Sequence, residues 1–129
     1  MIKGIMCRSI QKPVQQGHFT NLTLGKEYPV LSIEVYNSKV SNFSSTIGDF
    51  VIYRLRGDDG IILPYPSKLF EVTSNKMPSR WIPYKENDDI FMFIPISLAR
   101  EYFWDDFYND ENDAPLDLIK EEEIIIQES

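Results

Sequence analysis

The sequence has few of the residues that catalysis, disulfide bonding or metal binding usually require. Its 129 residues include one cysteine, Cys7, and one histidine, His18. A single cysteine excludes an intrachain disulfide, and the apolar alternation around Cys7 is typical of a buried free thiol. The sequence contains no Gly-x-Ser-x-Gly, no glycine-rich phosphate loop and no His-Glu-x-x-His. We therefore predict no enzyme activity, no catalytic residue, no metal site and no cofactor.

Long hydrophobic runs are also missing. No apolar stretch approaches the roughly 20 residues that span a bilayer. The first residues, MIKGIMCRSIQK, lack the apolar segment and small-residue cleavage site of a secretory signal. We therefore expect a cytoplasmic protein that does not contact membranes. A hydrophobic fraction of 43% is enough for one folded domain with a single core.

Short stretches of β-forming residues, separated by turn residues, recur along most of the chain. Leu24-Gly25 predicts a tight turn, and Gly57-Asp58-Asp59-Gly60 is the strongest hairpin signal. Pro29 favours an edge position or a bulge, because proline cannot donate to a strand ladder. A single 3₁₀ turn is expected at residues 66–68, and residues 74–89 read as irregular. This spacing predicts a small barrel or sandwich. The expected strands are residues 2–10, 26–36, 48–56, 61–65, 69–72 and 90–96.

The last third of the chain adds helical signals. Ser97 is a good N-cap, and residues 98–108 contain no glycine or proline, which predicts a helix there. Asp113 could cap a second helix, with Pro115 in its first turn and Leu116 and Ile119 on one side. The isoleucines at 124–126 favour a final strand.

Several turn- and core-forming residues follow one another in a fixed order in the first part of the chain. They are Cys7, Leu22-Thr23, Gly25-Lys26, Tyr28, Val30, Asp58-Asp59-Gly60, Tyr65-Pro66 and Phe70-Glu71-Val72. This order resembles the pattern of a group of small bacterial and phage proteins with SH3-like barrels, which is roughly a cysteine, then Leu-Thr-x-Gly-Lys-x-Tyr-x-Val, Asp-Asp-Gly and Tyr-Pro-x-x-x-Phe-Glu-Val. The resemblance covers residues 3–73 and implies a fold rather than an activity, because its residues are turn and core formers.

Together these signals predict a mainly β fold, an SH3-like small barrel of five to six strands with C-terminal helical elements (α+β). Residues 1–129 would form a single domain. Within it, residues 1–73 would be the barrel core, and residues 74–129 an acidic C-terminal extension that includes the helix at 98–108. The stretch FWDDFYNDENDA in that extension is loosely similar to segments of acidic bacterial immunity proteins, which neutralise a cognate toxin.

Charge is divided unequally between the two parts of the chain. The formal net charge is −7. Residues 1–80 contain ten lysine and arginine and six aspartate and glutamate residues, a net charge of +4, whereas residues 81–129 carry a net charge of −11. Such asymmetry indicates an interaction surface, and a strongly negative face attracts basic proteins or cations and repels nucleic acid.

The negative charge is densest among aromatic residues at 101–113. Trp and Tyr dominate binding hot spots, and carboxylates accelerate association with a basic partner. Alternatively, the rings cover the barrel and the helix face is merely solvated. Calcium is a further alternative, although the Asp-x-Asp-x-Asp-Gly loop spacing is missing. The predicted partner-binding residues are Trp104, Asp105, Asp106, Phe107, Tyr108, Asp110 and Glu111.

The sequence therefore favours a non-enzymatic protein that binds a basic partner. An immunity protein that occludes the basic active site of a toxin, such as a nuclease, is the leading hypothesis. The alternative is a phage or prophage accessory protein whose barrel binds nucleic acid or a host regulator through Arg54, Arg56 and Lys68. Nucleic-acid binding is the weaker hypothesis, because its affinity comes mainly from cationic contacts to phosphate.

Overall fold

The structure, a computed structural model, describes residues 6–9, 21–36, 51–74 and 77–129. These residues form a mainly β, barrel-like α+β fold, as predicted. The strands are β1 (Met6–Ser9), β2 (Glu27–Pro29), β3 (Ser32–Tyr36), β4 (Val51–Arg56), β5 (Ile62–Pro66), β6 (Phe70–Val72), β7 (Trp81–Lys85) and β8 (Ile90–Pro95). The helical elements are the 3₁₀ turns η1 (Ser67–Leu69) and η2 (Ile96–Leu98) and the helices α1 (Phe103–Tyr108) and α2 (Ala114–Glu128).

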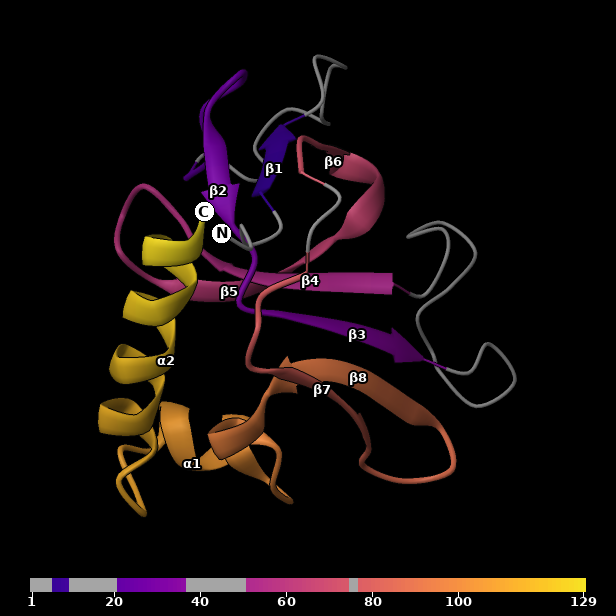
Figure 1. Cartoon of the computed structure of the whole chain (residues 1–129), viewed down its shortest axis with the longest axis vertical. Coiled ribbons are helices and arrows are strands. Elements are labelled where there is room, and N and C mark those ends of the chain that lie inside the picture. Colours follow the sequence, from indigo (N-terminus) through magenta and orange to yellow (C-terminus); the bar gives the residue numbers. More distant parts are fainter. Residues whose placement is uncertain (1–5, 10–20, 37–50, 75–76) are drawn as a thin grey trace.

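The strands form two antiparallel sheets (Figure 1). The smaller sheet has the order β2-β1-β6, and the larger has the order β5-β4-β3-β8-β7. Because β8 pairs with β3, the sheet begun by the first part of the chain continues past residue 73, and the strand expected at 90–96 is confirmed as β8. Pro29 ends β2, which is an edge strand of its sheet, so the missing N–H group costs no ladder bond.

The predicted strand at 26–36 is divided between the two sheets. Between β2 and β3 the chain bends at Val30 and Leu31, which are 0% and 1% exposed. Successive side chains of an extended chain point to opposite sides, so Val30 enters one core and Leu31 the other. The bend joins the two sheets into one barrel-like body.

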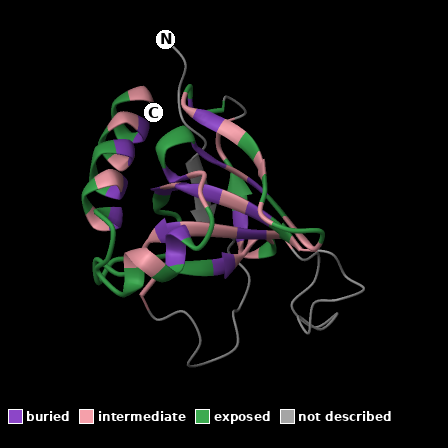
Figure 2. Ribbon diagram, turned by 90° about the horizontal axis from the view of Figure 1, so that it is seen from below, coloured by how far each residue is buried: buried purple, intermediate pink, exposed green. Residues whose placement is uncertain are grey.

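Two hydrophobic cores lie on opposite faces of the larger sheet. One fills the space between the sheets, and the other lies beneath the helices, whose buried residues face the sheet (Figure 2). The core between the sheets contains Tyr28, Val30, Leu55, Tyr65, Phe70 and Trp81. The core beneath the helices contains Leu31, Ile62, Met92, Ile94, Leu98, Phe103, Trp104, Ala114, Leu118 and Ile125.

Several residues of the barrel-like sequence pattern meet at the Asp58 carboxylate. Its two oxygens accept hydrogen bonds from Lys26 Nζ (2.6 Å), Thr23 Oγ1 (2.6 Å) and the Tyr28 hydroxyl (2.9 Å). The two turns that this carboxylate connects both need glycine, because Gly25 and Gly60 have φ of +81°. The Leu24-Gly25 and Asp-Gly signals in the sequence predicted these turns. Hydrogen bonds between residues of the sequence pattern therefore hold the two turns together, so these residues have a structural role.

We expect Asp58→Asn to lower the melting temperature at neutral pH and to remove part of its acid dependence. Hydrogen bonds from Lys26 and Thr23 lower the pKa of Asp58 to about 2, below its value of about 3.9 in an unfolded chain. A depressed carboxyl pKa stabilises the fold above the unfolded value, and this contribution is lost as pH falls toward 2. Thermal unfolding followed by circular dichroism should show a difference between wild type and variant that shrinks between pH 4 and pH 2. An equal difference at both pH values would contradict this, and the exposed Glu71→Gln is the control.

The helix predicted at 98–108 is wrong in its boundaries. Instead of capping a helix, Ser97 lies inside η2, which places Leu98 in the core at 1% exposure. Tyr102 then adopts a left-handed conformation, with φ of 60°, and only after it does α1 begin. An unbroken helix could not bury both Leu98 and Phe103 beneath the same sheet, since five residues turn a helix by about 500°.

Two further predictions for the last third are also corrected. Residues 81–85, read as irregular, form β7, and Pro83 is tolerated because β7 is an edge strand. The isoleucines at 124–126 belong to α2 and form no strand, because Ile125 completes the core beneath the helices. Asp113 does precede α2, but its side chain makes no capping hydrogen bond.

Candidate protein-interaction surface

Helix α1 turns most of its aromatic face inward. Phe103 and Trp104 are 2% and 9% exposed, and their rings meet edge to face at 5.0 Å. Phe107 is half-buried against the same core. Trp104 therefore cannot be the exposed anchor that the sequence predicted, and the interpretation in which the rings cover the barrel is correct for this side chain.

A buried ion pair explains why α1 lies where it does. Glu34, on β3, is 2% exposed and accepts hydrogen bonds from Arg54 Nε and from Arg54 Nη2 (3.3 Å). Tyr36 donates its hydroxyl to the same carboxylate (2.9 Å). The Arg54 guanidinium lies 4.5 Å from the centre of the Trp104 ring and 5.9 Å from that of Tyr108. The strands thus hold α1 through a cation–π contact as well as through apolar packing.

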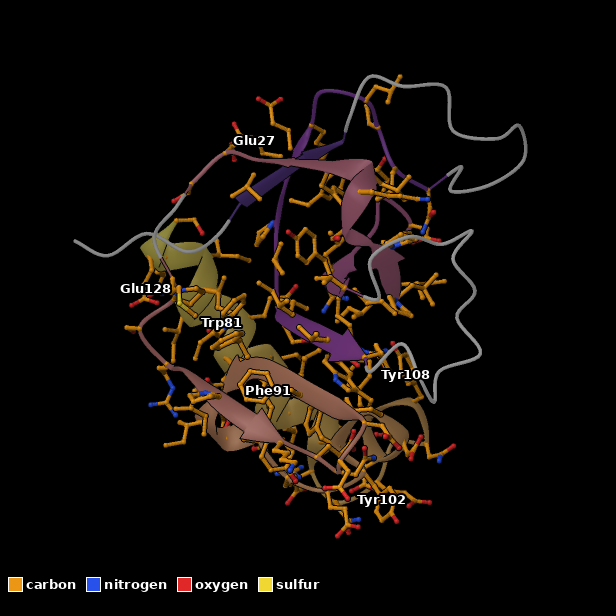
Figure 3. The ribbon with its side chains drawn as sticks, turned by 90° about the vertical axis from the view of Figure 1, so that its right-hand side faces the viewer. Glu27, Trp81, Phe91, Tyr102, Tyr108 and Glu128 are labelled. Carbon is orange, nitrogen blue, oxygen red and sulfur yellow. The ribbon has the colours of Figure 1, made fainter. Side chains whose placement is uncertain are left out.

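Tyr108 is fixed at one end and exposed at the other. Its hydroxyl donates to the carbonyl oxygen of Ile62 (2.7 Å) and accepts a hydrogen bond from Arg54 Nη1 (3.1 Å). Burial raises the pKa of Tyr108 and of Tyr36, and the Glu34 carboxylate raises the pKa of Tyr36 further. Even so, Tyr108 is 47% exposed, which makes it a pre-ordered ring at the surface. Tyr102 is 61% exposed, and Figure 3 shows it at the end of the molecule away from Glu27, with Tyr108 nearer the middle.

Most carboxylates of residues 101–113 face solvent, and none has a cationic partner among the described residues. We call residues 101–113 the acidic segment. Among the described residues, none of its aspartates or glutamates forms a salt bridge, although Asp106 accepts a hydrogen bond from Asn112 Nδ2 (3.2 Å). Burial raises the pKa of the nearby Glu86, and the charges of Glu34 and Asp105 add to that rise. The exposed carboxylates of the segment are Glu101, Asp105, Asp110, Glu111 and Asp113.

The fold positions the acidic segment through its neighbours. Arg100 donates to Asp117 (2.9 Å) on α2 and to the carbonyl oxygen of Asn112 (3.2 Å). Asp110, Asn112 and Asp113 all have φ between 54° and 58°, a left-handed conformation that aspartate and asparagine tolerate better than most residues. The Arg100 hydrogen bonds therefore fix the loop between α1 and α2 near its α2 end.

The arginines of the predicted basic face are already engaged. Arg54 is paired with Glu34, and Arg56 donates to both Glu122 oxygens (2.7 and 3.0 Å) and to the carbonyl oxygen of Gly60 (2.7 Å). Lys68 lies in η1, a separate element. A phosphate would have to displace these carboxylates, so the two arginines are not an open nucleic-acid surface.

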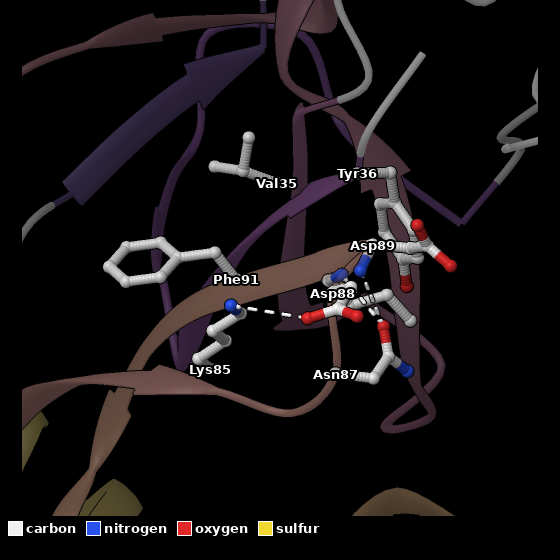
Figure 4. A pocket seen from close by; sticks show the side chains of 8 residues that line it. Val35, Tyr36, Lys85, Asn87, Asp88, Asp89 and Phe91 are labelled. Atoms are coloured by element: carbon white, nitrogen blue, oxygen red, sulfur yellow. Dashed lines mark hydrogen bonds and ion pairs between the residues drawn. The ribbon is translucent and has the colours of Figure 1, made fainter. Parts of the chain in front are cut away.

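The other candidate sites in the described residues bring few reactive or charged groups together. An open hollow of about 220 Å³ lies beside the β7–β8 turn, where Lys85 Nζ is 3.3 Å from Asp88 Oδ1 (Figure 4). Its other walls include Val35 and Phe91. Within the described ranges, which include the whole acidic segment, no three histidine, cysteine, aspartate or glutamate residues are placed to share a metal ion. His18 lies outside the described residues.

Sequence reasoning missed the buried polar residues, although a signal for them existed. Glu34 and Tyr36 alternate with Ile33 and Val35, so they share one face of β3. Arg54 shares the same face on the paired strand β4, where Ser32 is opposite Arg54 and Glu34 is opposite Ile52. An acidic residue on one strand and a basic residue on the same face of the neighbouring strand predict an ion pair. The sequence alone could not give this pair, because it does not show which residues of the two strands lie opposite each other.

Comparison with protein-family models, with curated proteins and with solved structures finds no match to this chain. In the described part of the chain, no helix is both long enough and apolar enough to cross a lipid bilayer.

Proposed function

We propose that this protein is a non-enzymatic binding protein whose acidic segment docks a basic partner protein. The observation that carries the proposal is an imbalance in charge pairing. The four arginines with described side chains, Arg54, Arg56, Arg80 and Arg100, all form salt bridges within the molecule. Among the described residues, no lysine or arginine pairs with the carboxylates of the acidic segment, so their negative charge remains available to a partner.

The exposed rings of the acidic segment are Tyr108, which was among the residues expected from the sequence, and Tyr102, which takes the place of Trp104 as an anchor. Tyr108 is held by Arg54 and by the Ile62 carbonyl group, so little side-chain entropy would be lost when a partner covers it. Asp105, Asp110 and Glu111 are exposed carboxylates of the same acidic segment. Tyrosine anchors with a charged rim are typical of protein interfaces.

The partner class that fits best is an enzyme with a basic active site. A nuclease cleft that binds phosphate carries the lysines and arginines that these carboxylates would pair with, and occupying it would exclude substrate. This supports an immunity protein that neutralises a toxin by steric and electrostatic occlusion. We place this function in the cytoplasm, because a single cysteine and no disulfide fit a reducing compartment.

The test compares two variants with equal changes in net charge. One is Asp105→Asn, Asp110→Asn, Glu111→Gln; the control is Glu71→Gln, Asp88→Asn, Asp89→Asn. The protein serves as bait in nuclease-treated lysate, and the Kd of the captured protein is measured over a range of salt concentrations. We expect the first variant to bind at least about tenfold more weakly, with a shallower salt dependence, and the control to bind like wild type.

Equal binding by wild type and both variants would overturn the proposal. Capture of nucleic acid from lysate without nuclease treatment, with no protein retained, would favour nucleic-acid binding instead, although Arg54 and Arg56 are already paired with carboxylates.

A further inference from the structure

The outer face of α2 carries exposed apolar residues that the fold does not use. Leu116, Ile119 and Ile126 are 59%, 55% and 53% exposed. Together with Glu123 they repeat at intervals of three, four and three residues, which is the spacing of the a and d positions of a heptad. We call these four residues the outer stripe. Figure 2 shows α2 with its buried residues toward the sheet and exposed residues along the opposite side.

The inner face of α2 makes the contacts that hold the helix against the rest of the protein. Ala114, Leu118 and Ile125 are at most 2% exposed in the core beneath the helices. Glu121 accepts hydrogen bonds from Arg80 Nε (2.6 and 3.0 Å), and Glu122 pairs with Arg56. The helix is therefore held from one side, and the outer stripe contributes little to holding it.

Glu123 distinguishes the stripe from an ordinary apolar patch. Asp117, Glu121 and Glu122 each pair with an arginine, and Glu128 accepts a hydrogen bond from the backbone of Ser79 (3.1 Å). Glu123 is exposed and, among the described residues, has no ionic partner. It lies between Ile119 and Ile126 in the stripe, so any helix that covered the stripe would cover this carboxylate too. A covered carboxylate is costly unless a cation meets it.

We propose that the outer stripe docks an amphipathic helix of a basic protein, with a lysine or arginine of that helix opposite Glu123. This inference deepens the proposed function and rests on it in one respect, namely that the partner is basic. The apolar residues of the partner helix pack on Leu116, Ile119 and Ile126, and the charge pair fixes the register, as a single polar residue does in a coiled-coil seam. Pairing of two helices in this way is a common form of peptide recognition.

A second copy of this chain is the other obvious occupant, and its charge argues against it. Two chains of net charge −7 repel each other. Pairing of two outer stripes in parallel would place Glu123 opposite Glu123. Antiparallel pairing would place it opposite an apolar residue of the other copy, so no cation would stand at the facing position of the stripe. Specificity of this kind comes from penalising the wrong partner.

Two synthetic helical peptides test the proposal. Both carry leucine at the a and d positions of three heptads, except that one central a position is lysine in the first peptide and glutamate in the second. Fluorescence anisotropy measures their Kd for the full-length protein. We expect the lysine peptide to bind wild type at least about tenfold more tightly than the glutamate peptide, equivalent to about 1.4 kcal/mol.

Glu123→Lys should reverse this preference, and Ile119→Ser should weaken both peptides. Glu71→Lys, which places the same charge change on a different element, should leave the preference unchanged. All these positions are exposed, so folding is expected to survive and is checked by circular dichroism. Binding by neither peptide, or binding that ignores the charge at residue 123, would overturn the proposal. So would sedimentation showing a dimer that Ile119→Ser disperses, since a second copy would then occupy the stripe.

The same assay separates this inference from the proposed function. The variant Asp105→Asn, Asp110→Asn, Glu111→Gln leaves the outer stripe intact, so its peptide preference should match wild type. If that variant still bound the natural partner like wild type, the docking function of the acidic segment would fail while the stripe kept its charge-dependent preference. If only the peptide preference were missing, the proposal for the acidic segment would remain and the proposal for the outer stripe would be wrong.

Discussion

Arg54→Met is expected to lower the free energy of unfolding by about 3–5 kcal/mol, the loss typical of breaking a buried ion pair by removing one partner. Glu34 is 2% exposed, and without Arg54 its carboxylate would keep only the Tyr36 hydroxyl among the hydrogen bonds described above. Helix α1 would lose its cation–π contacts at the same time, because the guanidinium lies against Trp104 and Tyr108. Urea denaturation followed by circular dichroism measures the loss.

Two controls show whether the buried charge is the cause. The double variant Glu34→Leu, Arg54→Met removes both charges, and it should recover much of the lost stability because no carboxylate remains buried alone. Lys85→Met breaks the Lys85–Asp88 pair, whose side chains are 66% and 97% exposed, and should cost no more than about 1 kcal/mol. A loss below about 1 kcal/mol for Arg54→Met would mean that Glu34 is able to reach water in the folded protein.

Local chemistry made the turns and most of the strands predictable from the sequence. The positive φ of Gly25 and Gly60 follows from the need for glycine in such turns, and stretches of β-forming residues between turn signals placed β3, β4, β5 and β8 close to their observed positions. These features depend on neighbouring residues, so a single sequence contains them.

The elements that were predicted wrongly depend on contacts distant in sequence. The isoleucines at 124–126 have strand propensity, but Ile125 is needed under α2 to complete a core built mostly from other elements. The left-handed Tyr102 interrupts a stretch that has no helix breaker, because both Leu98 and Phe103 must reach that core. Propensity is a weak guide where tertiary packing decides.

The candidate site was likewise only partly predictable from the sequence. The charge of the acidic segment was evident from composition, and its carboxylates do face solvent. Which of its rings face outward was not evident, because an amphipathic helix that covers a core and one that binds a partner have the same pattern of rings and acids. Only the position of Arg54 on β4, beneath Trp104, decides that this ring points inward.

Trp104→Ala is therefore expected to reduce stability rather than to affect binding alone. Trp104 is 9% exposed and packs against Phe103, Phe107 and Arg54, so its removal should lower the free energy of unfolding by about 3–5 kcal/mol, as is usual for a large buried ring. Tyr102→Ala, at a ring that is 61% exposed, should change stability by no more than about 0.5 kcal/mol.

The pair of variants separates the two roles that a ring in the acidic segment can have. Urea denaturation gives the stability of each variant, and the Kd for the captured partner is measured where both remain folded. If Tyr102 is an anchor and Trp104 a core residue, Tyr102→Ala weakens binding at unchanged stability, and Trp104→Phe, which keeps an aromatic ring in the core, retains both. A Trp104→Ala variant that is as stable as wild type but has lost its partner would instead show that this ring turns outward to bind.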